Sequence, residues 1–166
     1  MIATALLLLV PVALDRLSKV LLPAYLKNGN TITIIKGVVE LRLLEGGNTG
    51  AAFGMLKNGT LLLIIMTALL IIALMYLLFF RRFSSRWVYA AALLITAGGI
   101  GNLYDRVVYG YVTDFINFTF IDFPIFNIAD CYVCVGAAIL VGWLLLSGKD
   151  VDIFADGKKD EPDGGK

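Results

Sequence analysis

The sequence predicts a membrane all-α protein, a bundle of four transmembrane helices that carries a small extracytoplasmic β-sheet and an interfacial loop. Three observations lead to this prediction. Hydrophobic residues make up 59% of the 166 residues, more than an ordinary soluble domain contains. Four apolar segments are long enough to cross a bilayer, and the long segment after the first of them is rich in β-branched residues. We expect one membrane domain, residues 1–147, followed by a polar tail.

The four apolar segments differ in how well they fit a membrane span. A helix needs about 20 mostly apolar residues to cross about 30 Å of hydrocarbon. The second segment is uncharged, the third ends in a glycine cluster suited to close helix packing, and the fourth contains one charge, Asp130. The first is charge-free only to Leu14, but it lacks the basic start and cleavage site of a secretory signal. We therefore expect four retained spans, at residues 2–22, 61–80, 87–103 and 128–146.

Two connecting segments are too long and too patterned to be simple tethers. Residues 28–57 include a β-branched run at 31–35, a Lys-Gly pair suited to a turn, and alternating apolar and polar side chains at 38–43. This pattern predicts a small sheet on the membrane surface. Residues 107–126 are dense in Tyr and Phe, which suits the headgroup region of a bilayer and predicts an interfacial loop.

The distribution of arginine predicts the orientation in the membrane. Residues 81–86 hold three arginines, and short loops rich in Arg and Lys stay on the cytoplasmic side. Both termini are then cytoplasmic and the β-rich segment is extracytoplasmic. Residues 148–166 mix charges with almost no apolar side chains, which is typical of a disordered tail.

Four crossings bring the polar residues of the chain to one membrane face. The end of the first span, both long connections and the start of the fourth span share this face. Ionisable side chains within or beside lipid are costly and usually functional. The sequence therefore indicates a site at this face, where these residues are expected to meet: Asp15, Lys19, Asn48, Asn102, Asp105, Arg106, Asp114, Asn127 and Asp130.

Five stretches in this order resemble the sequence boxes of the bacterial lipoprotein, or type II, signal peptidases. They are residues 15–19 (DRLSK), 48–54 (NTGAAFG), 98–106 (GGIGNLYDR), 112–115 (VTDF) and 126–130 (FNIAD). The resemblance covers nearly the whole chain except the tail. It implies cleavage of a prolipoprotein signal peptide just before a diacylglyceryl-modified cysteine, at the outer face of the bacterial cytoplasmic membrane. It also implies that Asp114 and Asp130 are the catalytic pair.

The chemistry of peptide hydrolysis suits such a pair. A base must deprotonate the attacking water and an acid must protonate the leaving amine, and two carboxyls that share one proton supply both. Without His, the chain has no Ser-His or Cys-His relay and no His-based zinc site. Ser18 and Lys19 are adjacent, so on a helix they diverge by about 100° and form a poor catalytic pair. We expect no metal or cofactor and, at a net charge of +1, no nucleic-acid partner.

The other polar residues of the five stretches are expected to support the pair. Asn48, Gly50, Asn102, Arg106 and Asn127 are predicted to bind substrate or order the aspartates, although Asn48 equally suits a turn. Asp15, Lys19 and Asp105 are predicted to form stabilising ion pairs. Phe53 and Phe115 are candidate covers that clamp the peptide.

A second class of function stays open from the residues alone. Asp130 would also serve as a proton relay in a small proton-coupled carrier or an accessory subunit. A carrier is expected to place polar groups near mid-membrane and on both sides. The second span offers only Thr67 and Tyr76 as polar interruptions, which favours the peptidase.

Overall fold

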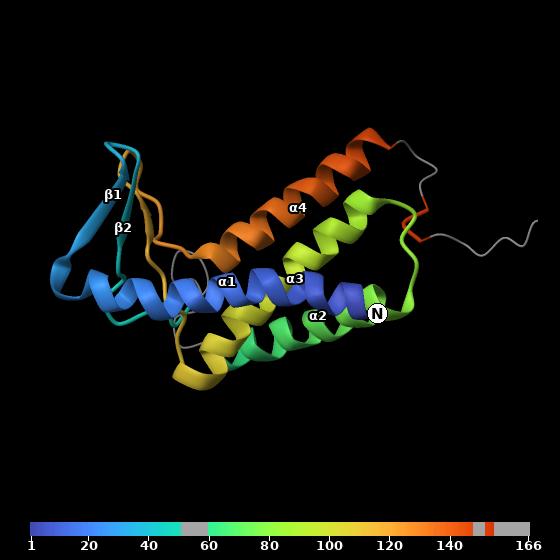
Figure 1. Cartoon of the computed structure of the whole chain (residues 1–166), viewed down its shortest axis with the longest axis horizontal. Helices are drawn as coiled ribbons and strands as arrows, with labels where there is room; N and C mark the ends of the chain where they lie inside the picture. The colour runs from blue at the N-terminus through green and yellow to red at the C-terminus, as the bar shows by residue number, and fades with distance from the viewer. Residues whose placement is uncertain (51–59, 148–151, 155–166) are drawn as a thin grey trace, which may run out of the picture.

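The computed structural model describes residues 1–50, 60–147 and 152–154, and four helices form its body (Figure 1). α3 contacts each of the other three helices and is the centre of the bundle. The small sheet lies at one end of the helices, and the N-terminus and the loop between α2 and α3 lie at the other. The helices are α1 (Ile2–Leu26), α2 (Thr60–Phe80), α3 (Arg86–Tyr109) and α4 (Ile128–Leu146).

Three of the described helices, α2, α3 and α4, are long and apolar enough to cross a membrane. α1 has 25 residues, but Asp15, Arg16 and Lys19 exclude it from this group. The prediction of a mostly helical membrane protein with a small sheet is confirmed at this level, with three span-capable helices rather than four.

Glycines bring α3 and α4 close together. A Cβ atom added at Gly98 would collide with the carbonyl oxygen of Ala129, and one at Gly136 would lie 2.8 Å from that of Ala91. Only glycine lets the two backbones approach this closely. The predicted role of the glycine cluster in helix packing is confirmed, and the packing holds the first turn of α4 against α3.

Two helices extend beyond their apolar runs. α3 continues past residue 103 to Tyr109, where Gly110 has φ 80° and its N–H donates to the carbonyl of Arg106. α1 likewise continues past residue 22 to Leu26, where a 3-10 turn (Lys27–Gly29) follows it. Hydrophobicity alone does not mark the end of α3, because the polar side chains of its extension, Asp105 and Arg106, find partners inside the protein.

The sheet has three antiparallel strands in the order β1-β2-β3. β1 (Thr31–Ile35) and β2 (Val39–Arg42) form the hairpin that the sequence predicts, with Gly37 at φ 75° in the turn. β3 (Ile116–Phe118) comes from the aromatic segment, where we expected only an interfacial loop. A three-residue strand carries too little pattern to be predicted, and its pairing partner lies far away in the sequence.

Three residues of the predicted tail lie against the loop between α2 and α3. The N–H of Ser84 donates to the carbonyl of Ile153 at 3.1 Å, and the Phe83 and Phe154 rings are 5.6 Å apart. Arg81 lies over the Phe154 ring at 4.6 Å from its centroid. These residues of the tail are therefore docked, whereas the rest of it and residues 51–59 lie outside the described part of the chain.

Candidate active site

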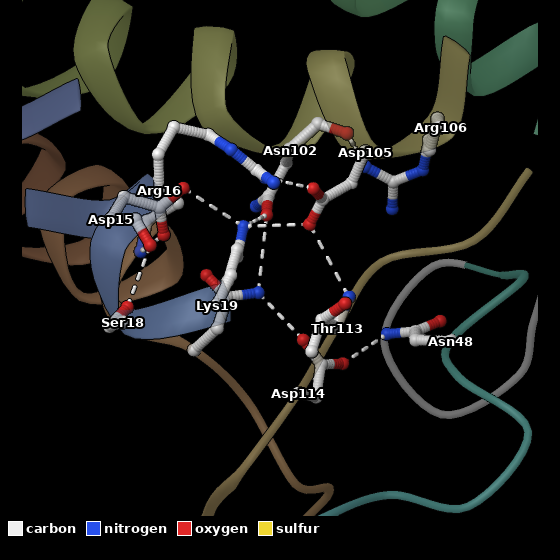
Figure 2. A network of polar contacts seen from close by, with 12 residues as sticks. Asp15, Arg16, Ser18, Lys19, Asn48, Asn102, Asp105, Arg106, Thr113 and Asp114 are labelled. Atoms are coloured by element: carbon white, nitrogen blue, oxygen red, sulfur yellow. Dashed lines mark hydrogen bonds and ion pairs between the residues drawn. The ribbon is translucent and has the colours of Figure 1, made fainter. Parts of the chain in front are cut away.

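The polar residues gather at the end of the helices that faces the sheet (Figure 2). They come from α1, from the turn after β2, from the second half of α3, from the segment after it, and from the start of α4. The residues that the sequence predicts to meet are linked by hydrogen bonds and ion pairs into one network.

Asp114 lies in the extended segment between α3 and β3, and the turn after β2 holds it there. Its carbonyl accepts a hydrogen bond from the N–H of Leu44 at 3.0 Å. Its side chain is buried, with Oδ1 2.6 Å from Asn127 Nδ2 and Oδ2 2.9 Å from Asn48 Nδ2. Burial raises the pKa of Asp114 to about 6, while the two amide donors act in the opposite direction by stabilising the carboxylate.

Asp130 lies in the first turn of α4 and takes part in a capping box. The side chain of Asn127 accepts the N–H of Asp130 at 3.2 Å, and Asp130 Oδ2 accepts the N–H of Asn127 at 3.1 Å. Its second oxygen, Oδ1, accepts Asn102 Nδ2 at 2.7 Å. Each carboxyl oxygen of Asp114 and Asp130 thus has one amide donor.

Asn127 and Asn102 connect the two carboxyls. Asn127 is fully buried and donates through Nδ2 both to Asp114 and, at 3.1 Å, to Asn102 Oδ1. Asn102 in turn donates to Asp130. Two aspartates that are 16 positions apart in the chain are therefore linked through one pair of amide side chains.

Behind the amides lies a buried cluster of charges. Lys19 Nζ is 3.1 Å from Asp15 Oδ2 and 3.1 Å from Asp105 Oδ2, and all three side chains have 0% exposure. The ammonium also donates to Asn102 Oδ1 at 2.9 Å. These contacts match the predicted ion pairing of the three residues.

Arg16 belongs to the same cluster, and sequence reasoning did not single it out. It pairs with Asp105 Oδ1 and its guanidinium lies 4.4 Å from the ring centroid of Tyr104. Two acids and two bases thus neutralise one another, as buried charges must. The only signal in the sequence is that Arg16 follows Asp15 in the first of the five stretches.

Arg106 and Asn48 order the turn that ends at Gly50. Asn48 pairs with Val112 as an isolated bridge, and its Oδ1 accepts the N–H of Gly50 at 3.0 Å. Arg106 Nη2 donates to the carbonyl of Gly50 at 3.4 Å, and its charge acts on both Asp114 and Asp130. Asn48 can therefore hold the turn through Oδ1 and bind Asp114 through Nδ2 at the same time.

An apolar cavity of about 260 Å³ opens beside Asp130. It lies between α2, α3 and α4, and its other polar lining residues include Thr67, Asn102 and Arg106. Most of its lining is aliphatic, including Leu70, Ile71, Leu74, Ile95 and Val133. Asp130 is partly exposed and lines this cavity, whereas Asp114 is 1% exposed and is not among the lining residues.

The other residues considered in the sequence are the two phenylalanines and Ser18. Phe53 lies outside the described residues, and Phe115 is 1% exposed and belongs to the interior. The Ser18 hydroxyl donates to the carbonyl of Asp15 at 2.7 Å, so it is engaged with the backbone of its own helix rather than with Lys19.

Comparisons with known proteins agree with one another. A sequence model of the family described as "Signal peptidase (SPase) II" matches residues 7–146. The lipoprotein signal peptidase of Streptococcus pyogenes serotype M5 (strain Manfredo) is 40% identical over 134 residues, which cover 81% of this chain and 87% of the relative. That of serotype M18 (strain MGAS8232) matches equally well.

Solved structures share the fold. One described as "Bacterial membrane enzyme structure by the in meso method at 2.3 A resolution" superposes with a TM-score of 0.79 at 29% identity, covering 92% of this chain and 95% of that one. A second, with the same description at 1.9 A resolution, gives a TM-score of 0.77 at 30% identity and covers 89% and 96%.

Proposed function

Because the chain belongs to the signal peptidase II family, we propose that it is a membrane aspartic endopeptidase that cleaves prolipoprotein signal peptides with Asp114 and Asp130. One observation carries the assignment of these two residues. Asp114 accepts a hydrogen bond from the Asn127 side-chain amide, and Asp130 accepts one from the Asn102 side-chain amide. Asn127 Nδ2 also donates to Asn102 Oδ1, so these two amides link the two carboxyls.

In this mechanism a water molecule lies between the two carboxyls. The ionised carboxylate removes a proton from the water as its oxygen attacks the scissile carbonyl carbon. The protonated partner gives its proton to the departing amine nitrogen, so the peptide bond breaks and a new carboxyl terminus forms. Asn48, Asn102 and Asn127 hold the two carboxyls, and Arg106 balances their charge.

The expected substrate carries a diacylglyceryl group on the cysteine that follows the cleaved bond. Its acyl chains lie in the bilayer, so the enzyme must admit it sideways between helices. The aliphatic cavity beside Asp130, between α2, α3 and α4, supports this route. Membrane lipid is then the second partner, in contact with the apolar outer faces of the helices.

We extend the proposal to four spans in the bacterial cytoplasmic membrane, with α1 as the fourth. A helix of 25 residues is about 37 Å long at about 1.5 Å per residue, which exceeds the hydrocarbon thickness. Its charged residues Asp15 and Lys19 are buried against the other helices rather than exposed to lipid. The arginine-rich loop 81–86 supports cytoplasmic termini and an extracytoplasmic site.

The test of the function is a pair of matched peptides. Each carries the same signal sequence and cysteine, and only one is diacylglyceryl-modified. We expect the purified protein to release the signal fragment from the acylated peptide alone, as measured by mass spectrometry of the products. Equal cleavage of both peptides would contradict the substrate assignment, and cleavage of neither would contradict the activity.

Asp114 sets the expected pH dependence. Since its pKa is raised to about 6, kcat/KM should show an inflection near that pH. The amide of Asn48 favours the carboxylate, so Asn48→Ala should raise this pKa further and move the inflection to higher pH. Asn117→Ala is the matched control, because that amide donates to Glu40 in the sheet. An inflection that stays in place or moves downward in Asn48→Ala would contradict the assignment.

The distribution of charge favours a peptidase over a proton-coupled carrier. Apart from Arg86 at the first position of α3, the charged residues of the described helices lie at the end that faces the sheet. A carrier is expected to place such groups on both sides of its binding site. Uptake into proteoliposomes, measured beside peptide cleavage, separates the two functions.

A further inference from the structure

Lys19 reaches both carboxyls of the proposed pair through side-chain amides. Its ammonium donates to Asn102 Oδ1 at 2.9 Å, and the NH2 of that amide donates to Asp130 Oδ1 at 2.7 Å. The same Oδ1 accepts Asn127 Nδ2 at 3.1 Å, and this NH2 also donates to Asp114 at 2.6 Å. Figure 2 shows the Lys19 ammonium between Asp15, Asn102 and Asp105.

The chemistry of the ammonium permits only one orientation of the Asn102 amide. A lysine side chain has three donors and no acceptor, so it must face an oxygen. A reversed Asn102 would turn its NH2 toward Lys19 and toward the NH2 of Asn127. It would also turn its oxygen toward the carboxylate of Asp130. All three reversed contacts are repulsive.

Lys19 cannot move away to tolerate such a reversal. Its ammonium is held by two ion pairs, with Asp15 Oδ2 and Asp105 Oδ2 each 3.1 Å from Nζ, and by the hydrogen bond to Asn102. Asp15 is itself fixed to the start of α4 by the N–H of Ala129 at 3.1 Å. The side chains of Lys19, Asp15 and Asp105 have no exposed surface.

We propose that Lys19 is a positioning residue for the reaction, which holds the Asn102 amide with its NH2 toward Asp130 and its oxygen toward Asn127. This inference rests on the proposed function and goes beyond ion pairing, which by itself would only stabilise the polar layer. The ion pairs with Asp15 and Asp105 fix the position of the Lys19 ammonium. Its hydrogen bond to Asn102 then fixes the orientation of that amide, and the bonds of Asn102 and Asn127 fix the donors that face the two carboxyls.

The double variant Asp15→Asn/Lys19→Met separates positioning from charge balance. It removes one acid and one base together, so the pair formed by Arg16 and Asp105 keeps its balance. If Lys19 positions Asn102, stability should stay close to that of the wild type while kcat falls by about 10-fold to 100-fold, since misplaced catalytic groups cost up to about 10²-fold. KM for the acylated peptide should change by less than about twofold, because the Lys19 side chain has no surface for substrate.

The measurements are thermal unfolding, kcat and KM. Lys36→Met is the matched control, because Lys36 is exposed in the turn between β1 and β2. A folded double variant with the kcat of the wild type would show that Lys19 is only a counter-ion and would overturn the inference. A loss that falls entirely on KM would overturn it as well.

A second variant decides the matter if the double variant does not fold. In Lys19→Ala, the space left by the lost side chain adjoins a cavity of about 390 Å³ whose lining includes the exposed residues Lys27 and Gly46. Propylammonium, which replaces the atoms lost in Lys19→Ala, can enter there. It should restore kcat in a saturable way in Lys19→Ala and leave Lys36→Met unchanged. Restored thermal stability without restored kcat would overturn the inference.

The two hypotheses fail in different ways. A wild-type protein that releases no fragment from the acylated peptide would contradict the proposed function. An active wild type whose folded double variant is equally active would contradict the role of Lys19 alone.

Discussion

Replacement of Asp130 or Asp114 by Asn is expected to reduce cleavage of the acylated peptide by at least about 1000-fold, within the range that general acid–base catalysis contributes. Neither amide can take a proton from water or give one to an amine. Both oxygens of Asp130 accept N–H donors, so the NH2 introduced by Asp130→Asn would face a donor, Asn102 Nδ2 or the Asn127 N–H, in either orientation. The measurement is single-turnover cleavage in detergent or lipid, with thermal unfolding as a check on folding.

Asp122→Asn is the matched control for both variants. Asp122 is an exposed carboxylate in the aromatic segment and takes no part in the network. It should keep the turnover of the wild type. An Asp114 or Asp130 variant that folds and keeps near-normal turnover would remove that aspartate from the mechanism.

Loss of the Asn127 amide is expected to have the next largest effect. Asn127→Ala removes the N-cap of α4 and the 2.6 Å donor to Asp114 at once. Loss of the cap should lower the free energy of unfolding by about 1 kcal/mol. Loss of the donor and of the link to Asn102 should lower kcat by about 100-fold, as for other preorganised donors.

Two further substitutions separate these contributions. Asn127→Ser keeps an oxygen that caps the helix but is too short to donate to Asp114, so stability should recover while kcat stays low. Asn127→Asp keeps the cap but replaces the donor by a third carboxylate. Its kcat should therefore be lower than that of Asn127→Ser. The comparison uses denaturant unfolding and kcat. A Ser variant that recovers both quantities would show that Asn127 acts only as a cap.

Much of the helical part could be predicted from the sequence because it depends on local composition. The run from Leu61 to Phe80 has no charge, and the observed α2 begins one residue earlier. α4 has the predicted bounds, since Asn127 and Asp130 form a local cap. The hairpin of β1 and β2 was predicted for the same reason, because its turn and both strands are close in the chain.

The parts that could not be predicted depend on contacts between distant residues. β3 is a strand because it pairs with β2, and the extension of α3 past residue 103 contains Asp105, whose partners Arg16 and Lys19 lie on α1. Arg16 was missed for this reason also, since its partner Asp105 lies 89 positions away.

By itself, the sequence determined that this protein belongs in a membrane and which polar side chains are gathered at one face, because apolar length and residue type are properties of single segments. The tertiary structure decided which oxygen each amide faces, that Asp114 is buried while Asp130 borders a cavity, and that Lys19 lies behind Asn102. The reason is geometric. A hydrogen bond requires a donor and an acceptor at about 3 Å, and only the packing of the helices sets distances between residues such as Lys19 and Asn102, 83 positions apart.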